Sequence, residues 1–136
     1  MSGHNDGIDV EKYLKSVKSV KGNSWCAAFV HWCLESAGIA NTINAWSPSA
    51  QNVKHFIYKA RSFLEEPKQG DVFTLYYVKL KRIGHTGFYH QRINNTVYES
   101  VEGNTNKAGS REGDGVYRKY RSFNATYSIS RWDKKQ

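Results

Sequence analysis

The sequence predicts a single domain of the α+β class, with helices first and a mainly antiparallel sheet after them. Apolar residues recur at intervals of three and four through much of residues 8–60, which is the spacing of one helix face. After Pro67 the chain turns to short runs of aromatic and β-branched residues separated by turn residues, which are typical of strands. Helices and strands that are segregated along the chain define the α+β class. The 136 residues contain no repeat and no linker, so one domain over residues 1–136 is expected.

Three helices are expected in the first half of the chain. Residues 8–21 show the spacing of a short amphipathic helix. A stronger helix is expected in WCAAFVHWCLESAG (25–38), with Ser24 as its N-cap and Gly38 as the left-handed residue that ends it. Residues 49–60 favour a third short helix, whose expected inward side chains are Val53, Phe56 and Ile57.

The second half of the chain is expected to form strands. The turn sequence PKQGD precedes the first strand, and Asn94-Asn95 separates two others as a hairpin turn. The expected strands cover residues 72–77, 85–93, 96–102, 116–123 and 126–132.

The chain is strongly basic, with 20 Lys and Arg against 12 Asp and Glu and a formal net charge of +8. Such a field attracts acidic wall polymers, nucleic acids and anionic lipid surfaces, although the same charge can serve solubility alone. No arginine-rich block or RNP-like motif is present, so a nucleic-acid partner is not expected. No apolar run approaches the roughly 18 residues of a membrane span. The N-terminus lacks the apolar core of a signal peptide.

Of the two cysteines, Cys26 is the candidate nucleophile. Both lie in the predicted helix 25–38, about 10.5 Å apart along its axis, which is too far for a disulfide bond. The absence of a C-x-x-C pair disfavours zinc. Cys26 falls in the first helical turn, where free N–H groups and the helix dipole stabilise a thiolate and a developing oxyanion. Cys33 lies in the middle of the helix and is expected to be a core residue.

His85 is the expected base for Cys26. If Asn94-Asn95 is a two-residue turn, counting back along both strands places His85 opposite Asn104 and one diagonal from Glu102. Because side chains alternate along a strand, these groups share one face. Either Glu102 or Asn104 could then accept a hydrogen bond from the imidazole and fix its tautomer.

Two simpler interpretations of the same strands stay open. A strand histidine is commonly a half-exposed pairing residue, and Glu-Gly-Asn is a common turn sequence. A register slip of one residue would also separate the groups named above. The pair His90 and Glu99 on the opposite face could equally be nominated.

Four motifs in order resemble the CHAP family of peptidoglycan hydrolases, which belongs with the NlpC/P60-type, papain-like cysteine peptidases. They are SWCAAFV (24–30), QGDV (69–72), GHTGFY (84–89) and VEGNT (101–105), and the resemblance runs from about residue 22 to about residue 121. Trp25 is a departure, because many members of the family have a polar residue before the cysteine. The wall-binding SH3-like module that usually accompanies the family is also absent.

The resemblance implies that Cys26 is the nucleophile, His85 the base and Glu102 the residue that orients His85, with Asn104 close to the site. It implies a papain-like or NlpC/P60-like fold in which N-terminal helices pack on a mainly antiparallel sheet. The implied activity is that of an N-acetylmuramoyl-L-alanine amidase or an endopeptidase of the peptide stem or cross-bridge, acting on peptidoglycan. No metal or cofactor is implied.

Two other functions are kept as alternatives: a cysteine protease that acts on proteins with the same residues, and a non-catalytic module that binds an anionic wall polymer. A wall hydrolase acts in the periplasm or outside the cell. Without a visible signal peptide, delivery by a phage holin, a secretion system or another route is expected. An immunity protein is the expected partner if the chain is an antibacterial effector.

Overall fold

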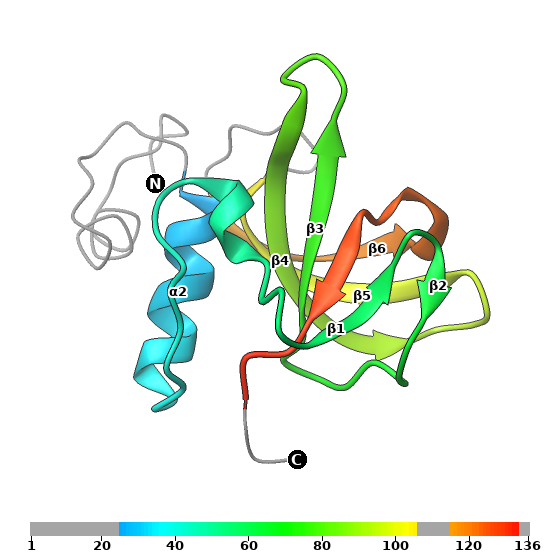
Figure 1. Cartoon of the computed structure of the whole chain (residues 1–136), viewed down its shortest axis with the longest axis horizontal. Coiled ribbons are helices and arrows are strands. Elements are labelled where there is room, and N and C mark those ends of the chain that lie inside the picture. Colours follow the sequence, from blue (N-terminus) through cyan, green and yellow to red (C-terminus); the bar gives the residue numbers. More distant parts are fainter. Residues whose placement is uncertain (1–24, 106–114, 134–136) are drawn as a thin grey trace.

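The computed structural model describes residues 25–105 and 115–133 (Figure 1). Within these residues one α-helix, α2 (Cys26–Ser36), precedes a single seven-stranded sheet. Two short 3-10 turns, η1 (Ser47–Ala50) and η2 (Phe123–Ala125), complete the regular structure. The strands are β1 (Phe56–Lys59), β2 (Ser62–Phe63), β3 (Val72–Tyr77), β4 (Arg82–Arg92), β5 (Val97–Thr105), β6 (Gly115–Ser122) and β7 (Ser128–Ser130).

All neighbouring strands are antiparallel, in the order β2-β1-β7-β3-β4-β5-β6. The expected fold class is therefore wrong. The described chain is mostly an antiparallel sheet with one helix, and it is not the papain-like α+β arrangement of N-terminal helices packed on a sheet. The helix expected at residues 8–21 lies outside the described residues, as does the expected N-cap Ser24.

The third expected helix, at residues 49–60, is also wrong. The 3-10 turn η1 ends at Ala50, and the chain then enters β1, which pairs with β2 and with β7. The segment FIYK is rich in aromatic and β-branched residues. A short apolar run of this kind fits both the spacing of a helix and the alternation of a strand. Pairing with β7, more than 60 residues later in the sequence, stabilises the strand over the helix. The local spacing of apolar residues does not reveal this pairing.

Helix α2 forms where the sequence predicts it. Its C-terminus is closed by Gly38, which has a φ of 78°. The Gly38 N–H donates to the Glu35 carbonyl at 3.0 Å, and the Ile39 N–H donates to the Leu34 carbonyl at 2.9 Å. This is a Schellman motif, so the predicted left-handed glycine is confirmed.

Two apolar cores lie on opposite faces of the sheet, because neighbouring side chains of β3 alternate between them. The first packs α2 against β4 and β5, and Figure 1 shows α2 lying beside the sheet. Its members include Trp25, Ala28, Val30, Leu34 and Val72. The second is mainly aromatic and includes Tyr58, Phe73, Tyr89, Tyr98 and Phe123.

The expected strands are confirmed, but the expected two-residue turn is not. Strands β4 and β5 are joined through residues 93–96, and the Asn94 Oδ1 accepts bonds from the backbone N–H groups of Thr96 and Val97, both at 2.9 Å. This turn shifts the pairing near it by one residue. A bulge between Tyr89 and Gln91 removes the shift, so Tyr89 faces Ser100 as predicted.

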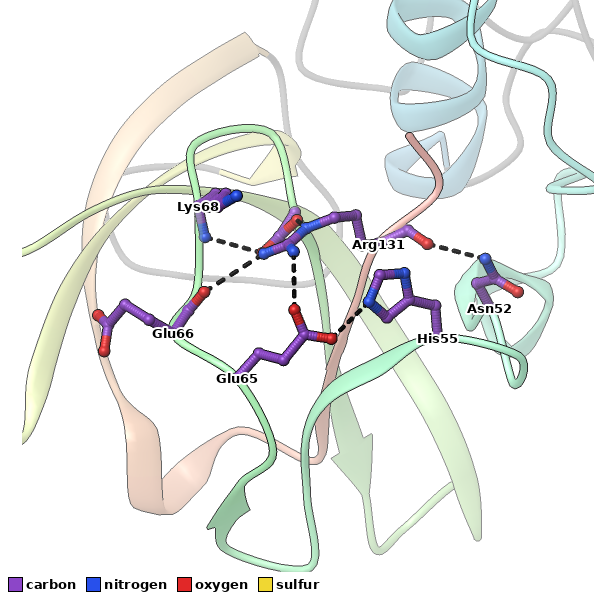
Figure 2. Close-up of polar contacts among 7 residues, drawn as sticks. Asn52, His55, Glu65, Glu66, Lys68 and Arg131 are labelled. Atoms are coloured by element: carbon purple, nitrogen blue, oxygen red, sulfur yellow. Dashed lines mark hydrogen bonds and ion pairs between the residues drawn. The ribbon is translucent and has the colours of Figure 1, made fainter. Parts of the chain in front are cut away.

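An ion-pair network joins the segment after β7 to the start of β3, with the Arg131–Asp71 pair buried at its centre (Figure 2). Arg131 donates from Nε and Nη2 to the two carboxylate oxygens of Asp71, both at 2.8 Å. It also reaches Glu65 at 3.2 Å, and Glu65 in turn bonds His55 at 2.6 Å. The backbone N–H of Lys68 donates to Asp71 at 2.8 Å. The Asp of the QGDV motif therefore holds β3 and the segment after β7 together.

Replacing Asp71 by Asn is expected to lower the free energy of unfolding by about 3–5 kcal/mol, because the buried Arg131 charge would lose its buried carboxylate and keep only the half-exposed Glu65. Chemical denaturation monitored by circular dichroism measures this loss. Glu66→Gln is the matched control, since the Glu66 side chain pairs with Arg92 at the surface and should lower stability far less. Equal, small losses in both variants would show that the Asp71 pair does not stabilise the fold.

Candidate active site

Cys26 is the first residue of α2, and the Trp25 backbone serves as N-cap without a side-chain hydrogen bond. The first turn contains no acidic residue that would compete with an anion for its N–H groups. The predicted placement of Cys26 at the positive end of the helix dipole is confirmed. Cys33, as expected, packs against the core around α2, and both cysteines are free thiols.

Tight packing brings the start of α2 onto β5. A Cβ atom on Gly103 would lie 2.7 Å from the Trp25 ring and 2.9 Å from the Cβ of Phe29. Only glycine therefore allows this approach. Gly103 directly follows Glu102 in the VEGNT motif, so the close approach also sets how near Cys26 lies to Glu102 and its partners.

Ser47 of η1 is a site residue that sequence reasoning missed. Its Oγ lies 3.3 Å from the Cys26 Sγ, and the contact is buried. Pro48 at the start of η1 fixes the local backbone, which places Ser47 over the helix start. A hydroxyl donates to a thiolate, so Ser47 can stabilise the ionised form of Cys26.

His85 lies on β4 beside a bulge. Leu75 of β3 pairs with His85, whereas the next pair is Tyr76 with Ile83, so β4 carries one extra residue at this point. Bulges bend a strand and redirect the side chains next to them. His85 Nε2 bonds Glu102 Oε1 at 2.7 Å, which confirms the predicted contact between these residues.

Gly87 makes space for that contact. A Cβ atom on Gly87 would lie 2.8 Å from the Phe73 ring and 2.9 Å from the Cγ of Glu102. The missing side chain at Gly87 therefore lets Glu102 and the Phe73 ring come close to β4 here. His85, Glu102 and Cys26 are all buried, with relative exposures of 1%, 0% and 1%.

Glu102 is held from a second side by Arg121 of β6, which sequence reasoning also missed. Arg121 donates from Nε to Oε2 at 2.6 Å and from Nη2 to Oε1 at 2.5 Å, a bidentate pair. Ser100 Oγ donates to Oε2 at 2.5 Å. Together with His85, these donors occupy all four lone-pair positions of the carboxylate.

The surroundings of Glu102 favour its ionised form. Burial alone would raise its pKa, but the hydrogen bonds and charges of Arg121 and His85 outweigh burial and lower the pKa to about 2. An ionised carboxylate only accepts, so His85 Nε2 must carry a proton. In neutral His85 the other nitrogen, Nδ1, is then the free base. Nδ1 is buried and has no hydrogen-bond partner among the described residues.

Cys26 and His85 shift each other's pKa in the directions that an ion pair requires. Burial lowers the pKa of His85, but the nearby Cys26 and Glu102 outweigh burial and raise it to about 9. Burial raises the pKa of Cys26, but His85, then Ser47 and the Thr86 backbone outweigh it and leave the pKa lowered. Both shifts favour the charged forms, a thiolate on Cys26 and an imidazolium on His85.

Asn104 and the alternative pair His90 and Glu99 are not part of the cluster around Cys26 that the structure describes. The backbone of Asn104 belongs to β5, but its side chain lies outside the described part of the structure, so the expected role of Asn104 stays a prediction. His90 and Glu99, the alternative pair, are 3.8 Å apart, with relative side-chain exposures of 23% and 14%. No hydrogen bond or ion pair joins that pair to Cys26 in the part of the chain that the structure describes, so it is not the partner of the candidate nucleophile.

No group of three or more His, Cys, Asp or Glu side chains in the described ranges is arranged to hold a metal ion. Among those ranges, too, no helix combines the length and the apolar character that crossing a membrane requires. No family model matches the chain, and neither a curated protein nor a solved structure matches it.

Proposed function

We propose that this protein is a cysteine-dependent hydrolase that cleaves an amide bond of bacterial peptidoglycan. The observation that carries the chemistry is the thiol of Cys26 at a helix N-terminus, coupled to a buried His85 that Glu102 and Arg121 orient. Such a group is an activated nucleophile with its base in place. The choice of peptidoglycan rests on the resemblance of the four sequence motifs to CHAP hydrolases and is supported by the basic charge of the chain.

The reaction follows from the ion pair. The Cys26 thiolate attacks the carbonyl carbon and forms a C–S bond, while the carbonyl π electrons move onto oxygen. In this mechanism the backbone N–H at Cys26, at the helix start, and the Ser47 hydroxyl, 3.3 Å from the Cys26 Sγ, donate to that oxyanion. His85 Nδ1 passes its proton to the amine as the C–N bond breaks, which leaves a thioester.

Water completes the cycle. His85, now neutral, takes a proton from water through Nδ1, and the hydroxide formed attacks the thioester carbon. The C–S bond breaks, and its electron pair returns to Cys26 as thiolate beside the imidazolium. The released acid and amine differ from the substrate by one added water. Glu102 keeps its charge throughout and steadies the imidazolium.

Mass spectrometry of the fragments released from purified peptidoglycan tests this function. Native protein is expected to release defined muropeptides, whose masses identify either an amidase or an endopeptidase, and Cys26→Ala is expected to release none. Cys33→Ala is the matched control and should act like the native protein. Cleavage of denatured protein substrate but not of peptidoglycan would replace the proposed substrate class. Binding to walls without turnover would favour the non-catalytic wall-polymer module.

Replacing Ser47 by Ala is expected to lower kcat by about 10²–10³-fold with little change in KM, the effect of removing one oxyanion donor. Ser49→Ala is the matched control in the same 3-10 turn, because Ser49 Oγ donates to the Trp46 carbonyl at 2.7 Å and lies away from Cys26. Steady-state kinetics on a soluble muropeptide measures both variants. An unchanged kcat in Ser47→Ala would remove Ser47 from the mechanism.

A further inference from the structure

A hollow of about 290 Å³ lies at the β1–β2 hairpin and shares no residue with the Cys26 site. It is here called the hairpin pocket, and it is lined by the end of β1, the hairpin turn, the end of β3 and the segment between η2 and β7. The lining residues used below are Lys59, Ala60, Arg61, Tyr76, Asn124 and Tyr127. Its volume is near the lower end for sites that bind small molecules.

Two tyrosines form an open aromatic wall in this pocket. Tyr76 and Tyr127 lie with ring centroids 5.4 Å apart and planes tilted by 33°. Each is 44% exposed, whereas the tyrosines of the aromatic core are buried. Exposed rings of this kind offer a flat apolar surface with a polar hydroxyl at the edge, which suits a ligand that is both apolar and polar. The C–H face of a sugar ring has this character.

The charges of the pocket are of one sign. Lys59 and Arg61 contribute cations, and no carboxylate is among the residues that line the pocket. Neither cation forms an ion pair with a carboxylate of the described residues. The Lys59 ammonium instead lies 4.5 Å from the centre of the Phe56 ring. Two unneutralised cations beside an amide, Asn124, favour an anionic ligand.

The turn that carries Arg61 is strained. Ala60 and Arg61 have φ values of 52° and 62°, and they are the two central residues of a two-residue hairpin between paired Lys59 and Ser62. Such turns normally use Asn-Gly, because side chains disfavour positive φ. Strained backbone of this kind is concentrated at ligand sites. A glycine at position 61 would relieve the strain, but it would not supply the guanidinium that Arg61 brings to the pocket.

We propose that the hairpin pocket binds an acidic saccharide, that is, a sugar unit bearing a carboxylate or a phosphate. The sugar face packs on Tyr76 and Tyr127, and the anionic group is bound by Arg61 and Lys59. Bound in this way, one unit of an acidic sugar polymer would hold the protein on that polymer. The proposal stands apart from the proposed hydrolase function, since it uses none of the residues around Cys26.

Isothermal titration calorimetry tests the proposal with the full chain carrying Cys26→Ala, so that no ligand is turned over and the result does not depend on catalysis. The probes are a tetramer of galacturonic acid, a mannose oligosaccharide phosphorylated at O6, neutral cellotetraose and a single-stranded DNA oligonucleotide. Binding of either acidic saccharide, with at least about tenfold weaker binding of cellotetraose, is expected. Comparison of the two acidic probes tells carboxylate from phosphate recognition.

The same titrations on Arg61→Gly and Tyr127→Ala are expected to show at least about tenfold weaker affinity for the acidic saccharide that the native site prefers. Because glycine adopts positive φ freely, Arg61→Gly should keep the native Tm, so its loss of affinity cannot come from unfolding. Arg118→Gly and Tyr120→Ala, at exposed positions of β6, are the matched controls and should bind normally. Unchanged affinity in Arg61→Gly and Tyr127→Ala, no saccharide binding, or tighter binding of DNA would each overturn the proposal.

Discussion

Alanine at His85 is expected to lower kcat/KM for amide cleavage by about 10⁴–10⁶-fold, the range seen when the base of a nucleophile–base pair is removed. The loss has two sources. The leaving amine would no longer receive a proton from Nδ1, and the pKa of Cys26 would rise because the largest influence that opposes burial comes from His85. Turnover of a soluble muropeptide, followed by mass spectrometry, measures the change.

His90→Ala is the control for this experiment, since His90 lies on the same strand and pairs with a carboxylate, Glu99, whereas Cys26 takes its bonds from other residues. It should keep most of the native activity. Circular dichroism of both variants checks that each is folded. If His90→Ala lost as much activity as His85→Ala, the assignment of the base to His85 would be wrong.

Replacing Arg121 by Met is expected to lower kcat by about 10²–10³-fold while KM changes little, because Arg121 acts through Glu102 and not on substrate. Without its bidentate partner, the pKa of Glu102 rises from about 2 toward its ordinary value. Glu102 would then take up a proton at higher pH and stop orienting His85. The acid limb of the pH profile of kcat/KM should therefore move to higher pH.

Arg121→Lys keeps the charge but not the two parallel bonds, and it should recover part of the lost activity with a smaller shift of the acid limb. Arg118→Met is the matched control from the exposed side of the same strand and should change neither kcat nor the profile. An Arg121→Met profile that falls in amplitude without any shift of its acid limb would mean that Arg121 serves packing alone.

The three residues Cys26, His85 and Glu102 were predictable because each follows from a local pattern. A helix start locates the cysteine, and one hairpin locates the other two. The hairpin prediction succeeded although its turn was wrong, because the bulge at Tyr89–Gln91 restores the expected pairing before the strands reach Ser100 and Glu102. Bulges leave no signal in the alternation of a sequence, so this agreement could not be foreseen.

Arg121 and Ser47 were not predictable in the same way. Arg121 can be placed on the same face as Glu102 only once the register of β5 and β6 is known, and alternation within either strand does not give that register. Alternation along β6 does place Tyr117, Lys119 and Arg121 on one face. This was the only feature of the sequence that could have pointed to Arg121 as a site residue. Ser47 approaches Cys26 through a 3-10 turn, and nothing in its neighbours marks it as a partner of the thiol.

The predicted fold class was wrong because the fold depends on strand pairing between residues far apart in the sequence. Residues 56–63 form a hairpin that pairs with β7, so the sheet gains strands from a segment whose local spacing favours a helix. Long-range pairing of this kind overrides short-range propensity. The site survives this error because the elements that carry it, α2, β4 and β5, are among those that were correctly predicted.

The ionisation of Cys26 is the most direct test of the ion pair. The ultraviolet absorbance of the thiolate, followed against pH in a Cys33→Ser background, reports on Cys26 alone. The expected result is a pKa below the free value of about 8.5, with a rise above that value in His85→Ala. The expected thiolate–imidazolium pair exists between the lowered pKa of Cys26 and the pKa of His85 at about 9. A Cys26 pKa at or above about 8.5 that stays the same in His85→Ala would contradict the ion pair and, with it, the proposed hydrolase mechanism.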